Sequence, residues 1–153
     1  MNVCQFLRDH GVRFETLPHR EAYDAQRLAQ AVHVPGKMVA KTVLLRANHR
    51  YGYLVAVVPA TKKIDLEQLS RALGGCQLEL ASEDEICEHC PDCEPGVLPP
   101  FGSQYAMQTV VDESLADQEE IVFEGNTHDE AIRMRFEDFK HLEEPLIIPF
   151  TKD

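Results

Sequence analysis

Two neighbouring β-rich runs constrain the fold of this chain more than any other feature of its sequence. Residues 38–46 and 51–58 are rich in Val, Leu and Ala, and their apolar residues occupy successive positions rather than alternate ones. Successive side chains of a strand point to opposite faces, so such a run predicts a strand that is covered on both sides. Residues 47–50 have the length of a hairpin connection, and Pro59 ends the second run. We therefore predict that the two runs pair as central strands of a sheet.

Shorter helices and strands surround these runs in no regular alternation. Asp24, Asp65 and Ser82 stand at expected helix N-caps, and Glu85 completes a capping box with Ser82. The predicted helices cover residues 3–7, 24–33, 65–73, a stretch that begins at residue 82, and 136–142. The predicted strands cover residues 12–17, 77–80, 104–111, 120–123 and 132–136. This pattern indicates an α+β fold with a mixed, mostly antiparallel sheet. No repeat or linker divides the chain, so residues 1–153 are expected to form a single domain.

The composition is that of an ordinary globular domain, with an uneven distribution of charge. No apolar run approaches the ~20 residues of a membrane span, and no signal-peptide pattern is present, so we expect a cytoplasmic protein without membrane contacts. The net charge is −11, but residues 1–75 hold 11 Lys and Arg against 6 Asp and Glu. This asymmetry predicts one local cationic face on an acidic protein; the alternative is an acidic half that only aids solubility.

Three cysteines at two-residue gaps form the most conspicuous motif. Cys87, Cys90 and Cys93 have the spacing of a metal half-site, but a closed zinc site needs a fourth ligand. Cys76, His89 and Cys4 are the remaining candidates for that ligand. No second C-x2-C pair exists, and five cysteines without a secretion signal favour reduced thiols. We therefore expect no metal and no cofactor.

Cys93 is a weak candidate for a nucleophile. It is flanked by Asp92 and Glu94, and two acidic neighbours are expected to raise the pKa of its thiol. A cysteine hydrolase is correspondingly disfavoured.

The loop that follows, residues 96–102, has the character of a backbone-built binding site. Its glycines permit positive φ and a close approach to a ligand, and its prolines restrict the chain. The amides of Val97, Leu98, Phe101 and Gly102 are then available to donate to a carbonyl or an oxyanion. The alternative is a rigid connection between a helix and a strand.

Three further residues could complete a site. Lys41 falls in a row of apolar residues on its predicted strand, where a lysine either extends to solvent or meets an anion such as phosphate. His19 and His128 lie on predicted loops, where each could line a pocket or simply be solvated.

These residues, in this order, resemble the YbaK/prolyl-tRNA synthetase-associated editing-domain superfamily of free-standing aminoacyl-tRNA deacylases. The resemblance covers nearly the whole chain. The matching motifs are His19 before a helix, Val39-Ala40-Lys41-Thr42-Val43-Leu44-Leu45, Val57-Val58-Pro59-Ala60, the loop from Gly96 to Gly102, and Phe123-Glu124-Gly125 with His128.

The resemblance implies a single α+β domain with a barrel-like sheet surrounded by helices, and a pocket for an amino acid esterified to tRNA. It implies that Lys41 contacts the substrate near the terminal adenosine, and that Gly96 to Pro100 positions the scissile ester through backbone amides. His19, Gly125 and His128 would belong to the substrate site. Water would be the attacking group, with no protein nucleophile.

Departures from the family pattern bear on specificity. Asp24 stands where many members have Thr or Ser, and Asp92-Cys93 replaces a glycine before the loop, so Asp92 and Cys93 are expected at the pocket edge. The amino-acid specificity of the family therefore does not carry over to this chain, and we hypothesise a small amino acid such as alanine.

The partner implied is the acceptor end of tRNA, with a synthetase or an elongation factor as a further possibility. The candidate phosphate contacts are Lys37, Arg46, Arg50, Lys62, Lys63 and Arg71. Two other functions stay open: a non-catalytic module that binds aminoacyl-adenosine or tRNA, and a cysteine-ligated metalloprotein.

Overall fold

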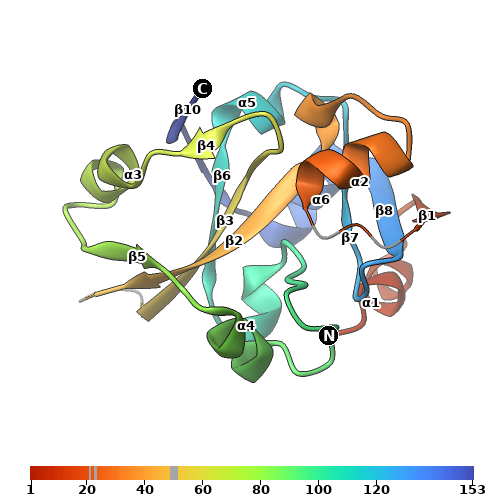
Figure 1. The fold of residues 1–153 in the computed structure, drawn as a ribbon, viewed down its shortest axis with the longest axis horizontal. Coiled ribbons are helices and arrows are strands. Elements are labelled where there is room, and N and C mark those ends of the chain that lie inside the picture. The colour runs from red at the N-terminus through yellow and green to blue at the C-terminus, as the bar shows by residue number, and fades with distance from the viewer. Residues whose placement is uncertain (21, 23, 49–51) are drawn as a thin grey trace.

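The computed structural model describes residues 1–20, 22, 24–48 and 52–153, and its largest sheet is built on the two β-rich runs (Figure 1). In sheet order the strands are β5 (Leu78–Leu80), β2 (Ala40–Ala47), β3 (Gly52–Pro59), β6 (Gln108–Asp112) and β9 (Leu146–Ile148). Strands β2 and β3 pair antiparallel over their full length and occupy central positions, as predicted. β5 pairs antiparallel with β2, whereas β6 runs parallel to both β3 and β9.

Two smaller sheets lie beside the five-stranded one. An antiparallel sheet has the order β1 (Phe14–Pro18), β8 (Glu130–Arg135) and β7 (Glu120–Glu124), and β10 (Thr151–Lys152) pairs with β4 (Lys63–Ile64). A single parallel bridge from Val39 to Val122 links the first of these to the start of β2. The α+β, mixed-sheet prediction is confirmed. The barrel-like arrangement is not, because one bridge between described residues does not close the sheets.

Most helices begin where their caps predict. Asp24 and Asp65 each accept a hydrogen bond from a backbone amide three residues on, and Ser82 forms the predicted capping box with Glu85. The helices are α1 (Val3–Asp9), α2 (Ala25–Ala31), the 3-10 helix η1 (Gly36–Met38), α3 (Leu66–Ala72), α4 (Glu83–His89), the 3-10 helix η2 (Gly102–Tyr105), α5 (Glu113–Ala116) and α6 (Phe136–Glu143). No described helix has the length and hydropathy to cross a membrane.

Several strand boundaries differ from the prediction: Met38 lies in η1, Phe136 begins α6, and the largest shift precedes β6. Residues 104 and 105 were expected to begin a strand, but they belong to η2, and β6 starts only at Gln108. Ala106, at φ 57°, ends η2 in the left-handed region, and Met107 N donates to the Gly102 carbonyl. This turn is closed by contacts that strand propensity does not encode.

The core explains why the central runs are apolar on both faces. Leu44, Val55 and Val57 pack into one cluster with the rings of Phe101 and Phe139. Their neighbours along the same strands pack into a second cluster, which contains Leu45, Leu54, Ala56, Val58, Leu69 and Phe150. Both faces of β2 and β3 are thus covered, and polar side chains can be grouped only near the strand ends.

Candidate functional site

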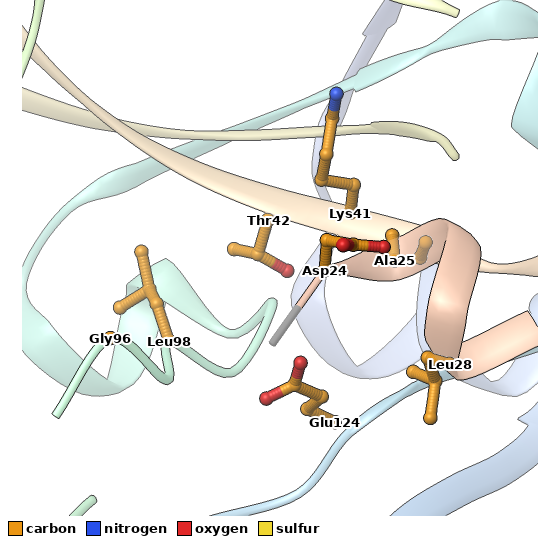
Figure 2. A pocket seen from close by; sticks show the side chains of 9 residues that line it. Asp24, Ala25, Leu28, Lys41, Thr42, Gly96, Leu98 and Glu124 are labelled. Carbon is orange, nitrogen blue, oxygen red and sulfur yellow. The ribbon is translucent and has the colours of Figure 1, made fainter. Parts of the chain in front are cut away.

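A pocket of about 200 Å³ opens where four separate segments meet at the start of β2 (Figure 2). Its wall combines the first residues of α2, the start of β2, the loop after α4 and the end of β7. The lining residues are Asp24, Ala25, Leu28, Ala40, Lys41, Thr42, Gly96, Leu98 and Glu124. The volume lies below the ~300–1,000 Å³ of pockets for drug-sized ligands. Such a space suits a group of the size of a small amino acid.

Gly96 owes its place in the wall to its backbone conformation. The Glu94 amide donates to the Asn126 carbonyl at 2.9 Å, and the Val97 amide donates to the Glu94 carbonyl at 3.0 Å. The resulting turn places Gly96 at φ 86°, in the left-handed region, as the glycine in the sequence predicts. A side chain at this position would be strained by roughly 1–2 kcal/mol.

Two of the four amides predicted to bind a ligand are already engaged. The Val97 amide closes the turn onto Glu94, and the Gly102 amide donates to Thr109 Oγ1 at 2.9 Å. The prediction was wrong for these two because their partners come from the turn itself and from β6. Leu98 and Gly96 line the pocket, and neither of their amides donates to another atom of the described residues.

The other residues of the predicted loop are buried beneath the pocket wall and pack against the core. Phe101 is fully buried, and its ring packs against those of Phe6, Phe123 and Phe139. Val97 and Pro100 are also buried and do not line the pocket. These residues hold the loop in place, and their predicted contact with substrate stays a prediction.

His128 connects this loop to β7. Its Nε2 lies 2.8 Å from the Pro95 carbonyl and its Nδ1 lies 3.2 Å from Glu124 Oε2. A carbonyl only accepts, so Nε2 carries a proton and Nδ1 faces the carboxyl group. The two side chains are 8% and 18% exposed, and the bridge is therefore shielded from water.

The pKa values of both Glu124 and His128 are raised from their ordinary values, for different reasons. Burial raises the pKa of Glu124 to about 7, although the neighbouring His128 opposes the shift. Burial disfavours a charged imidazole, but the Pro95 carbonyl and the Glu124 carboxylate outweigh it and raise the pKa of His128. The pair is consequently poised to hold or release a proton near neutral pH.

Glu124 is a pocket-lining residue that the sequence interpretation missed. It was noted only as part of the Phe123-Glu124-Gly125 motif, yet its carboxyl group faces the pocket (Figure 2). The available signal was a carboxylate that ends an apolar strand directly before the turn bearing His128.

Lys41 and Thr42 point to opposite sides of β2. Lys41 lies in the predicted apolar row, with Val39 and Leu45 fully buried, and it is itself partly exposed at the pocket rim. Figure 2 shows its amine pointing away from Glu124, whereas the Thr42 hydroxyl points towards the side of the pocket that holds Glu124. Among the described residues, no carboxylate lies within 4 Å of the Lys41 amine, which is thus available to an external anion.

The structure places the other predicted substrate residues outside the pocket lining. The His19 amide donates to the Asp129 carbonyl at 2.9 Å, and Gly125 is a buried turn residue whose amide donates to Glu130. Asp92 and Cys93 lie behind the turn that carries Gly96, where Asn126 Nδ2 donates to Cys93 Sγ at 3.4 Å. None of the four is a lining residue.

Comparison with known proteins identifies the family. Residues 19–142 match the model of the aminoacyl-tRNA editing domain. The chain belongs to this family. A search of curated protein sequences found no match.

Solved structures support the same fold for this editing domain. It aligns with hypothetical protein APE2540 at a TM-score of 0.84 and 17% identity, over 98% of this chain and 99% of that one. It aligns with a candidate trans-editing enzyme for prolyl-tRNA synthetase at a TM-score of 0.83 and 22% identity, over 99% of this chain and 95% of that one. A candidate signal transduction protein from Marinobacter aquaeolei VT8 aligns at a TM-score of 0.76 and 22% identity, over 99% of this chain and 30% of that one. At these identities the likeness shows the fold.

The spacing of Cys87, Cys90 and Cys93 in the sequence does not bring all three sulfurs into one group. All five are free thiols, and the sulfurs of Cys90 and Cys93 gather with Asp92 rather than with Cys87. The pKa of Cys93 is lowered to about 7, mainly by the hydrogen bond with Cys90 and also by Asn126 and Tyr105. The expectation of a raised pKa was therefore wrong, because these donors outweigh the acidic neighbour Asp92.

Three of the predicted tRNA contacts, Lys37, Lys62 and Lys63, lie on two segments that meet beside the start of β2. The Ala60 amide donates to the Val39 carbonyl at 2.9 Å, and Lys41 pairs with Val58 across β2 and β3. Segments 36–41 and 58–63 are thus adjacent, and together they carry Lys37, Lys41, Lys62 and Lys63.

Two other predicted cations, Arg46 and Arg71, are not on these segments. Arg46, near the far end of β2, forms ion pairs with Glu79 at 3.0 Å and Glu85 at 3.6 Å. Arg71 is exposed on α3. Arg50 lies outside the described residues.

The Glu124–His128 pair predicts a pH-dependent stability. Both pKa values are raised in the folded state, so the pair stabilises the fold fully below about pH 4.5, and this contribution is lost as the pH rises through about 7. Between about pH 5 and pH 8, the free energy of unfolding measured with urea should fall on the order of 1–3 kcal/mol more for the wild type than for Glu124→Gln. Glu67→Gln, on exposed α3, should follow the wild type. Parallel curves for wild type and Glu124→Gln would contradict the assignment.

Proposed function

We propose that this editing domain is a trans-editing deacylase that hydrolyses the ester between a small amino acid and the terminal ribose of a mischarged tRNA, for example alanyl-tRNA. The observation that carries the proposal is the composition of the pocket wall. It combines Lys41 at the rim, the loop residues Gly96 and Leu98 on one wall, and the acidic residues Asp24 and Glu124. Among the residues that the structure describes, neither a cysteine nor a histidine lines the pocket.

An aminoacyl ester has three polar parts, and each has a complementary group at this pocket. The α-ammonium group suits the carboxyl groups of Asp24 and Glu124. The ester carbonyl suits the amides of Gly96 and Leu98. The phosphate next to the terminal adenosine suits the Lys41 amine at the rim, since an ammonium group binds phosphate as a point charge. The substrate would thus enter with its side chain inward and its tRNA outward.

Hydrolysis in this arrangement uses water as the nucleophile. Glu124, with a pKa of about 7, is suited to accept a proton from a water that attacks the carbonyl carbon. The two amides then stabilise the oxyanion, and the ribose hydroxyl leaves with a proton. The products are the free amino acid and deacylated tRNA. His128 would act as a positioning residue, since it holds Glu124 and the Pro95 carbonyl together.

The size of the pocket supports a small amino acid. Leu28, Leu98, Ala25 and Ala40 supply its apolar walls, and its volume is about 200 Å³. A longer side chain would require a movement of Leu28 or Leu98, both of which are nearly fully buried.

A cytoplasmic tRNA is the substrate partner that we propose. The lysines of segments 36–41 and 58–63 offer a cationic face beside the pocket, while residues 76–153 hold 20 Asp and Glu against 4 Lys and Arg. This acidic half would repel the tRNA body and limit contact to the acceptor end. A synthetase or an elongation factor could deliver the tRNA to this face.

Hydrolysis of a panel of mischarged tRNAs tests the proposal. The wild type should release the amino acid from at least one small-residue aminoacyl-tRNA. Lys41→Ala and Gly96→Ala should each lower kcat/KM about tenfold or more, because they remove a phosphate contact and distort the carbonyl-binding turn, respectively. Lys140→Ala, exposed on α6, should match the wild type.

Two outcomes of that panel would contradict the proposal. One is the absence of ester cleavage on every member by a protein that still binds an aminoacyl-adenosine analogue, which is the behaviour of a non-catalytic binding module. The other is full activity in Lys41→Ala and Gly96→Ala together.

The salt dependence of tRNA binding tests the cationic face separately. Each phosphate contact contributes about 0.7–0.9 to the slope of log K against log salt concentration. The triple variant Lys37→Ala/Lys62→Ala/Lys63→Ala should therefore bind more weakly at low salt, with a shallower slope. Lys140→Ala again serves as the control. An unchanged slope in the triple variant would place the tRNA on another face.

A further inference from the structure

Cys90 and Cys93 occupy the two ends of a tight turn behind the pocket. Cys90 is the C-cap of α4, and the Cys93 amide donates to the Cys90 carbonyl at 3.2 Å. In such a four-residue turn the first and last Cα atoms lie within about 7 Å, and disulfides usually span about 4.4–6.8 Å. Pro91, at the second position, fixes φ and favours the turn. The two sulfurs lie within 4.8 Å of each other.

The two thiols differ in exposure and in hydrogen bonding. Cys90 is 1% exposed, and its sulfur lies 3.0 Å from the Tyr105 hydroxyl. Cys93 is partly exposed, and Asn126 Nδ2 donates to its sulfur at 3.4 Å. The pKa of Cys93 is lowered to about 7, chiefly by the Cys90 hydrogen bond, while that of Cys90 is raised, chiefly by the same bond and then by burial. The accessible sulfur is therefore the better nucleophile, and the buried one keeps its proton.

We propose that Cys90 and Cys93 form a redox-active dithiol that reacts with low-molecular-weight disulfides and closes into an intramolecular disulfide. The Cys93 thiolate attacks one sulfur of the small disulfide, the S–S bond breaks, and one small thiolate leaves. Cys90 then loses its proton to solvent and attacks Cys93 Sγ, which releases the second small thiol. The protein gives up two electrons and two protons, and the small disulfide becomes two thiols.

The surroundings favour a dithiol over a metal site. A closed zinc site needs four ligands, and the described residues supply three here: the two sulfurs and an Asp92 oxygen. Asp92 Oδ2 already contacts the Met1 amino group, and the Cys90 thiol donates to Asp92 Oδ1 at 3.7 Å. Cys87, the third cysteine of the motif, is not part of this group.

The dithiol is distinct from the editing pocket, and its chemistry does not depend on the proposed function. Neither cysteine lines the pocket. The turn nevertheless leads directly into Glu94, whose amide donates to the Asn126 carbonyl. Formation of the disulfide would thus modify Cys93 Sγ, the atom to which Asn126 donates, and would leave every pocket-lining residue chemically unchanged.

Thiol–disulfide exchange with glutathione tests the proposal. The reduced full-length chain is incubated in buffers of varied ratio of oxidised to reduced glutathione, quenched with acid, alkylated and analysed by intact mass and peptide mapping. The wild type should lose two hydrogens and yield a Cys90–Cys93 disulfide, while Cys4, Cys76 and Cys87 stay alkylatable. Cys90→Ser should stop with one glutathione on Cys93. Cys93→Ser should react with glutathione disulfide at least about tenfold more slowly than the wild type, because the remaining Cys90 thiol is mostly protonated.

Cys87→Ser is the matched control, and it should form the disulfide as the wild type does. Three results would overturn the proposal: no Cys90–Cys93 disulfide in the wild type, glutathione on Cys4 or Cys87 as fast as on Cys93, or about one equivalent of zinc that shields Cys90 and Cys93 from alkylation. Peptide mapping of the wild type decides the first two without reliance on the folding of any variant.

Discussion

The His128 imidazole bridge is the interaction on which the pocket depends. It joins the Pro95 carbonyl, one residue before Gly96, to the Glu124 carboxyl at the end of β7. The two walls come from segments about thirty residues apart, and this shielded contact sets their separation. Burial raises the pKa of Glu124 to about 7, and the contact with His128 limits that rise. One histidine thus links the shape of the site to its proton chemistry, and the loss of either partner would alter both.

The position of the site follows from the central strands. Because both faces of β2 and β3 are packed in apolar clusters, a polar pocket has to form at a strand end. Lys41 and Thr42 stand at the start of β2, beside the bridge from Val39 to β7. The alternation of the strand then assigns the two side chains to opposite sides: the Lys41 amine lies where we propose that the tRNA phosphate binds, and the Thr42 hydroxyl lies on the side of Glu124. Sheet packing and substrate orientation therefore share one cause.

The sequence predicted what local chemistry determines. Caps at Asp24, Asp65 and Ser82 need only neighbouring amides, and Gly96 needs only a turn that requires positive φ. The prediction failed where a distant partner decides. Gly102 gives its amide to Thr109, the pKa of Cys93 falls through contacts with Cys90 and Asn126, and the importance of Glu124 rests on its burial against His128. The family motifs placed Lys41 and Gly96 at one pocket, and the structure brings them together there.

The most direct test of the account is a crystal structure of the protein with a non-hydrolysable amide analogue of alanyl-adenosine. We predict that the alanyl group occupies the pocket, with its carbonyl oxygen within hydrogen-bonding distance of the Leu98 or Gly96 amide and its ammonium group facing Asp24 or Glu124. An analogue bound outside this pocket, or one whose carbonyl oxygen points away from both amides, would contradict the account.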